Sequence, residues 1–344
     1  MNYFDWLPIE LLHEIAGDSE PAYKALLVYP RFARAVTYNV CIDYMVLFGH
    51  DVCVDKYTTE WLRSGKKHRC GNPAVIYPSG DEDWYHDGNL HRDGGPAMIH
   101  EYALKWYRNG LVHRDDGPAM LLSTVPGELK TGMEHDTTLC AYAYAAWYRN
   151  GVQHRDDGPA IINVNEVEMW YRNGVKHRDD GPAMIEVNGN QYWYRNGVKH
   201  RDDGPAIILA NGDEEWYQNG KLHRDDGPAA IEVNGEKQWW YRNGVKHRDD
   251  GPAIILANGK QWWYRNGVKH RDDGPAIIEV NGSQYWYRNG VKHRDYGPAV
   301  ILVNGSQYWY RNGVKHRDDG PAVILVNGYE EWYINGLHHD AIKL

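Results

Sequence analysis

The chain has 344 residues, enough for two domains of ordinary size, and combines 26 Tyr, 15 Trp and 36 Gly with only 3 Phe. This aromatic, glycine-rich composition favours short strands and turns over helices. The formal net charge is −9, but nine acidic and four basic residues lie in the first 60 positions, so the remainder is close to neutral. A chain without a basic face does not suit a nucleic-acid backbone, so we expect no nucleic-acid partner.

The cysteines predict neither a disulfide framework nor a zinc site. Cys41, Cys53, Cys70 and Cys140 show no CxxC spacing and follow no repeat. No stretch approaches the roughly 18 consecutive apolar residues of a membrane span, and no basic region precedes an apolar run at the N-terminus. We therefore expect a cytoplasmic protein without metal or cofactor, and no membrane partner.

The first 45 residues predict a small α-helical module, followed by a connector at 46–56. Leu7, Leu11, Leu12 and Ile15 recur at helical spacing after Pro8, and Pro suits the first turn of a helix. A second apolar segment over 21–36 predicts another short helix. Neither segment shares any pattern with the rest of the chain.

The stretch "LPIELLHEI" resembles the F-box family, which docks on a Skp-type adaptor of cullin-RING ubiquitin ligases. The resemblance implies an adaptor contact made by five residues: Leu7, Pro8, Leu11, Leu12 and Ile15. A helical cap that only shields the first hairpin would need the same apolar face. Periodicity alone therefore leaves both interpretations open.

Residues 57–344 consist of about twelve units of roughly 23 residues, each marked by a Trp followed by a His seven positions later. The marker tryptophans lie at 61, 84, 106, 147, 170, 193, 216, 240, 263, 286, 309 and 332. The units at both ends keep only this skeleton, as terminal copies of a stacked array do. About 18 residues, at 123–141, are inserted into one unit.

Each unit predicts short antiparallel strands joined by two Asn-Gly turns, such as Asn188-Gly189 and Asn196-Gly197, which we expect to be of type I′. An Asp-Asp-Gly-Pro corner then leads to the next unit, because Pro cannot donate a ladder hydrogen bond. Counting outward from the turns places two sets of side chains on opposite faces. The expected interior face carries Ile185, Val187, Tyr192 and Tyr194, and the other face carries Met184, Glu186, Trp193 and His200.

The repeated "HRDD" motif has the residue types of a catalytic or metal site but the distribution of a structural one. His-Arg-Asp occurs ten times without a kinase glycine-rich loop, VAIK or DFG. Adjacent Asp residues in a turn are better explained as turn formers than as a glycosidase pair. One His per unit places neighbours about 10 Å apart, too far to share an ion, so we expect Asp or aromatic partners.

Irregular positions are better candidates for binding than the repeated ones. The 123–141 insertion is one. The double aromatics Trp239-Trp240 and Trp262-Trp263 are another, as a candidate target-binding patch, although simple drift from Tyr to Trp is the better explanation of them. The alternation of Glu and Leu between successive units, as at Glu186 and Leu209, fits duplication of unit pairs or a two-unit binding footprint.

The skeleton of Trp, Asn-Gly, His and Gly at a 23-residue period resembles MORN repeats, in a variant form similar to multi-copy repeat proteins of large DNA viruses of amoebae. The resemblance implies a mainly β, elongated antiparallel β-hairpin array. We expect a non-enzymatic adaptor, whose F-box-like module recruits a Skp/cullin ligase and whose array binds a target protein, in the host cytoplasm if the chain is viral. A structural scaffold, or one associated with a membrane surface, is the alternative.

Overall fold

The computed structural model describes residues 51–54, 58–126, 143–163, 167–232 and 235–339. The chain divides into two compact units, 1–165 and 166–344. The predicted helical module at 1–45 and most of the insertion, 127–141, lie outside the described residues. No helix long and apolar enough to cross a membrane occurs in the part that is described.

Both units consist of very short strands. In the N-terminal unit these are β1 Asp51–Val54, β2 Thr59–Arg63, β3 Lys66–Lys67, β4 Val75–Ile76, β5 Glu82–Asp83, β6 Tyr85–His86, β7 Asn89–Leu90, β8 Met98–His100, β9 Ala103–Lys105, β10 Tyr107–Arg108, β11 Leu111–Val112, β12 Met120–Leu122, β13 Tyr144–Ala146, β14 Tyr148–Arg149, β15 Val152–Gln153 and β16 Ile161–Asn163. Strand β1 lies inside the predicted connector and pairs with β2, so the sheet begins before residue 57.

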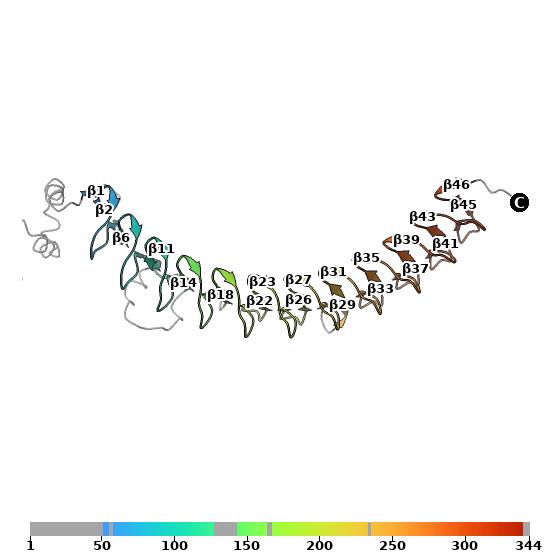
Figure 1. Cartoon of the computed structure of the whole chain (residues 1–344), viewed down its shortest axis with the longest axis horizontal. Helices are drawn as coiled ribbons and strands as arrows, with labels where there is room; N and C mark the ends of the chain where they lie inside the picture. The colour runs from blue at the N-terminus through green and yellow to red at the C-terminus, as the bar shows by residue number, and fades with distance from the viewer. Residues whose placement is uncertain (1–50, 55–57, 127–142, 164–166, 233–234, 340–344) are drawn as a thin grey trace, which may run out of the picture. The chain divides into compact units, whose positions relative to one another are not determined.

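The C-terminal unit repeats the same pattern (Figure 1). Its strands are β17 Glu168–Met169, β18 Tyr171–Arg172, β19 Val175–Lys176, β20 Met184–Ile185, β21 Gln191–Tyr192, β22 Tyr194–Arg195, β23 Val198–Lys199, β24 Ile207–Ile208, β25 Glu214–Glu215, β26 Tyr217–Gln218, β27 Lys221–Leu222, β28 Ala230–Glu232, β29 Lys237–Trp239, β30 Tyr241–Arg242, β31 Val245–Lys246, β32 Ile254–Ile255, β33 Gln261–Trp262, β34 Tyr264–Arg265, β35 Val268–Lys269, β36 Ile277–Ile278, β37 Gln284–Tyr285, β38 Tyr287–Arg288, β39 Val291–Lys292, β40 Val300–Ile301, β41 Gln307–Tyr308, β42 Tyr310–Arg311, β43 Val314–Lys315, β44 Val323–Ile324, β45 Glu330–Ile334 and β46 Leu337–His339.

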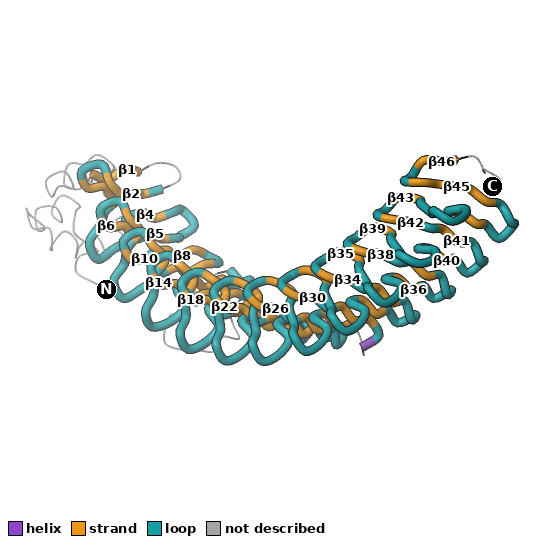
Figure 2. The backbone as a smooth tube through the Cα atoms, turned by 45° about the vertical axis from the view of Figure 1, so that its right-hand side comes forward, coloured by secondary structure: helices purple, strands orange, loops and turns teal. Residues whose placement is uncertain are grey.

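Each repeat contributes one hairpin to a long antiparallel sheet and forms a second, separate hairpin. In the repeat that begins at Trp193, β24 pairs with β25 in the long sheet, while β22 pairs only with β23. The strand expected between the two Asn-Gly turns is divided at Trp193, whose backbone N–H donates to Ala206 O at 2.8 Å and whose carbonyl accepts from His200 N at 3.2 Å. The chain therefore changes partners at each Trp, and strands alternate with loops along the tube (Figure 2).

The two Asn-Gly pairs form different turns. Asn196 and Gly197 have φ of +51° and +82°, which confirms the type I′ turn predicted there. At the other pair only Gly189 is left-handed, with φ of +89°, and its N–H donates to Glu186 O at 2.8 Å. The prediction of a second type I′ turn was wrong, because this is a longer loop in which glycine alone takes the left-handed conformation.

The longer loop shifts the register by one residue, so the predicted faces were wrong in part. Met184 lies opposite Tyr192, and Ile185 lies opposite Gln191. Because directly opposed residues share a face and a one-residue slip exchanges the faces, Tyr192 lies with Met184 and not with Ile185. Val187, predicted to be interior, is 64% exposed.

The core consists of small side chains in columns along the array. An alanine before each long-sheet hairpin is fully buried at 74, 97, 119, 160, 183, 206, 229, 253, 276, 299 and 322. The next residue is buried in most repeats, as at Ile207 and Ile254. A fully buried column of alanines leaves room for only one methyl group per repeat, so neighbouring hairpins approach closely.

Candidate functional site

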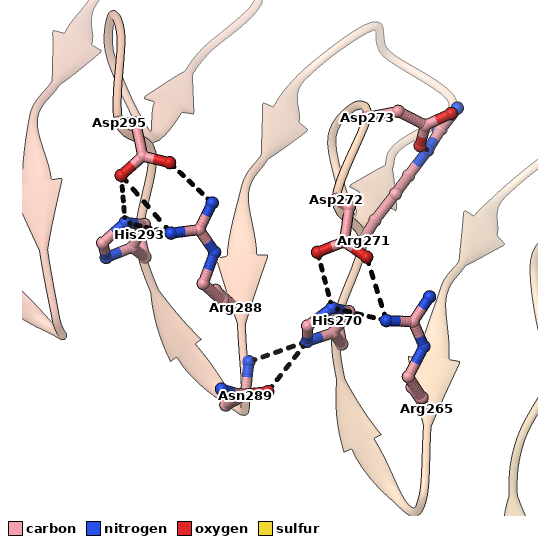
Figure 3. Close-up of polar contacts among 9 residues, drawn as sticks. All are labelled: Arg265, His270, Arg271, Asp272, Asp273, Arg288, Asn289, His293 and Asp295. Carbon is pink, nitrogen blue, oxygen red and sulfur yellow. Dashed lines mark hydrogen bonds and ion pairs between the residues drawn. The ribbon is translucent and has the colours of Figure 1, made fainter.

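The repeated His forms a three-residue polar network within its own repeat (Figure 3). His270 Nε2 lies 3.0 Å from Asp272 Oδ1, and Arg265 Nη1 donates to Asp272 Oδ2 at 2.9 Å. The His270 side chain is almost completely buried, whereas Asp272 is exposed. Arg265 and His270 therefore each contact a different oxygen of the same carboxylate.

The other ring nitrogen connects adjacent repeats. The backbone N–H of Asn289, in the next type I′ turn, donates to His270 Nδ1 at 3.1 Å. Nδ1 also lies 3.0 Å from Asn289 Oδ1; acceptance of the backbone N–H by Nδ1 favours the tautomer with its proton on Nε2, where it faces Asp272. The same bond recurs from Asn196 to His177, from Asn266 to His247 and from Asn312 to His293. The histidine column thus bonds each hairpin to the one before it.

The arginine after each His stacks on the marker Trp. Arg271 Cζ lies 4.1 Å from the ring centroid of Trp263, Nε donates to Asp273 Oδ1 at 2.9 Å and Nη1 donates to Pro275 O at 3.3 Å. A Cβ added at Gly274 would lie 2.8 Å from Arg271 Cζ. The φ of Gly274 is not left-handed, so the backbone conformation does not require glycine here. Glycine is needed because the guanidinium approaches so closely.

The network lowers the pKa of both carboxyl groups in the Asp272–Asp273 pair. Hydrogen bonds from Arg265 and then His270 lower the pKa of Asp272, and a hydrogen bond from Arg271 lowers the pKa of Asp273. General acid catalysis by a carboxyl pair requires one member whose pKa is raised. This arrangement holds charges in fixed positions and offers no protonated carboxyl group.

Two inner repeats of the C-terminal unit depart from the network. Tyr296 replaces the second Asp of the corner and is 90% exposed, and the following Gly297 has a left-handed φ of +101°. Arg294 still stacks on Trp286 at 4.0 Å, and burial lowers its pKa. In another repeat Gln218 stands where Arg is usual. The fold therefore accommodates the loss of one ionic partner.

The candidate target-binding tryptophans are not equivalent. Trp240 and Trp263 belong to the marker column, and each is covered by an arginine at 4.1 Å from its ring. Trp239 and Trp262 lie in the long sheet on either side of Ile254, which is opposite both. All four are partly buried, and Ile254 is only 1% exposed. Binding by these residues stays a prediction.

The other predicted site residues lie elsewhere. The five predicted adaptor-binding residues, between positions 7 and 15, lie outside the described residues. Most of the insertion also lies outside them, and Ser123 at its start is buried. The stacking of arginine on the marker Trp was not predicted from the sequence. The signal was available, since Gly follows Arg by three residues in every well-formed corner.

Neither the known family models nor the curated proteins contain a match to this chain.

Proposed function

We propose that the chain is a non-enzymatic interaction adaptor, in which the MORN-like hairpin array binds a target protein and the F-box-like residues 1–45 recruit a Skp-type adaptor of a cullin-RING ligase in the cytoplasm. The observation that supports it is the repeated network itself. His, Arg and both Asp side chains bond one another and neighbouring backbone in repeat after repeat. Residues engaged in this way hold an array together.

The exposed surface of the separate hairpins supports a protein target. The valine after each type I′ turn is 42–44% exposed at 175, 198, 245, 268, 291 and 314. Each valine packs against the glycine of the next turn. A Cβ added at Gly197, for example, would lie 3.4 Å from Val175 Cβ. Arg–Asp ion pairs, such as Arg265–Asp272, lie in the same repeats. Protein interfaces combine an apolar core with a polar rim, and a row of valines beside exposed ion pairs offers both.

Affinity capture of the full-length protein from a eukaryotic cytosolic extract tests the proposal. We expect recovery of Skp and cullin subunits with the wild type and loss of both with Leu7→Ala/Leu11→Ala. Leu111→Ala/Val198→Ala, which shortens two exposed side chains of the array, is the matched control and should retain them. If the wild type recovers neither subunit, the adaptor function is wrong. Light scattering that then shows concentration-dependent side-by-side association would favour the structural scaffold.

A further inference from the structure

The second repeat contains a group of metal-ligand side chains that no other described repeat has. His86 stands where Arg is usual, and Asp87 stands in the turn where Asn is usual. Both face His68 of the preceding repeat, which is fully buried. One ligand atom from each of the three residues lies within 4.8 Å of the others. Two departures from the repeat therefore coincide around a single histidine.

The expected 10 Å separation of histidines does not apply here. His86 is not a member of the His column, and its ring centroid lies only 4.7 Å from that of His68. The Asp87 carboxylate contacts both rings, with Oδ1 at 2.9 Å from His68 Nδ1 and Oδ2 at 3.6 Å from His86 Nδ1. Two imidazole nitrogens thus converge on one carboxylate.

The turn residue Asp87 places a carboxylate beside His68. His68 Nδ1 accepts the backbone N–H of Asp87 at 3.0 Å, as in the other repeats, and also lies 2.9 Å from Asp87 Oδ1. In ordinary repeats the oxygen at this place belongs to a neutral amide, as with Asn289 Oδ1 at 3.0 Å from His270 Nδ1, whereas the Asp87 side chain offers only acceptors. A proton on Nδ1 would pair with the carboxylate but would oppose the backbone N–H. A metal ion would take the nitrogen and the oxygen as ligands, and the Asp87 N–H would then give up Nδ1 as its acceptor, because this nitrogen has one lone pair.

We propose that His68 Nδ1, His86 Nδ1 and the Asp87 carboxylate form a binding site for a divalent transition-metal ion of the Zn²⁺ type. Imidazole with one carboxylate suits zinc and similar ions, whereas Mg²⁺ and Ca²⁺ prefer oxygen ligands alone. Ligands of a tetrahedral zinc ion are about 3.4 Å apart at bond lengths of about 2.0–2.2 Å. His86 and Asp87 are 57% and 59% exposed, so these two side chains can close onto the ion while His68 stays fixed.

Cys70 acts as a positioning residue for this site. Its Sγ lies 3.4 Å from His68 Nε2, on the ring edge opposite the proposed ion. In the ordinary repeat an Asp occupies this position and accepts the Nε2 proton. Partners of this kind orient metal-binding histidines and fix their tautomer. The thiol therefore holds the His68 ring without itself being a ligand.

Two substitutions restore the residues that the array uses elsewhere. The full-length protein and His86→Arg/Asp87→Asn are freed of metal and titrated with Zn²⁺ and with Co²⁺, followed by calorimetry and by visible absorption. We expect one tight site in the wild type that the double variant lacks, with affinity lower by more than about 100-fold, because loss of a positioning partner alone costs about 10–100-fold. Asp93→Asn, which removes an exposed carboxylate of the same repeat, is the control and should leave the tight site unchanged.

The Co²⁺ spectrum tests the ligand assignment. We expect d–d bands from a nitrogen and oxygen ligand set, no thiolate charge-transfer band, and the same spectrum in Cys70→Asp. Equal numbers of tight sites in the wild type and in His86→Arg/Asp87→Asn would overturn the metal site. A charge-transfer band that disappears in Cys70→Asp would overturn the ligand set. Circular dichroism identical to the wild type shows that the double variant folds.

Discussion

Gly274→Ala tests the stacking of arginine on tryptophan. The added Cβ would lie 2.8 Å from Arg271 Cζ and 3.0 Å from Nε, so the guanidinium has to leave its place over Trp263. Because Gly274 is not left-handed, Ala brings no backbone strain. The cost of the substitution is therefore the loss of the arginine contacts alone.

The magnitude follows from those contacts. An arginine over an aromatic ring contributes about 0.5–2 kcal/mol. The hydrogen bond to Pro275 O contributes about 0.5–1.5 kcal/mol, and the bond to the fully exposed Asp273 adds little because water screens it. Replacement of Gly stabilises by about 0.4–1 kcal/mol through the unfolded chain. We expect a net loss of about 1–3 kcal/mol in the free energy of unfolding.

Urea unfolding followed by tryptophan fluorescence measures this loss, and a double-mutant cycle identifies its cause. Arg271→Ala removes the side chain that the new Cβ would meet, so Gly274→Ala in that background should cost little or should stabilise. If Gly274→Ala is as stable as the wild type, or costs the same with and without Arg271, the explanation of this glycine is wrong.

Three further outcomes are expected. Asn312→Ala should lower the free energy of unfolding by about 1–2 kcal/mol, because Asn312 has a left-handed φ of +51°. Asn304→Ala, in the other turn, should lower it less. Equal losses would contradict the assignment of the two turn types. Hydrogen bonds from Arg288 and His293 hold the pKa of Asp295 at about 2, below its ordinary value of 3.8. The ionised carboxylate therefore stabilises the fold fully at pH values above 3.8, and this stabilisation is lost as the pH falls through about 2. The stability difference between wild type and Arg288→Gln should therefore be present at neutral pH and vanish near pH 2, and a difference that persists there would refute the linkage. Tyr296→Asp restores an acceptor for Arg294 and should raise the melting temperature slightly; a lower melting temperature would show that the left-handed Gly297 conformation requires Tyr.

The repeat and its hairpins could be predicted from the sequence because they depend on local chemistry. Asn196-Gly197 specifies its turn directly, and the marker Trp sets the period. The register could not be predicted in the same way. Asn188-Gly189 has the same two letters but forms a longer loop, and a one-residue difference in loop length exchanges the faces of Met184 and Ile185.

The structural role of the repeated polar residues could be predicted from the sequence, but their hydrogen-bond partners could not. Repetition indicated that His and the Asp pair are structural, and the geometry of His270 and Asp272 agrees with that interpretation. The bond from Asn289 N–H to His270 Nδ1 joins residues 19 positions apart, so no local pattern reveals it. The His68–His86 contact was not predicted, because the spacing between histidines was worked out only for the repeated His of each unit, to which His86 does not belong.

Amide hydrogen exchange at Asn289 tests the central claim that the repeated histidine holds neighbouring repeats together. We expect the Asn289 N–H to be protected in the wild type and to exchange much faster in His270→Leu. The neighbouring Gly290 N–H, which donates to Lys269 O at 2.9 Å, should remain slower than Asn289 in the variant. An Asn289 amide that exchanges at an unprotected rate in the wild type, or at the same rate with and without His270, would contradict the claim.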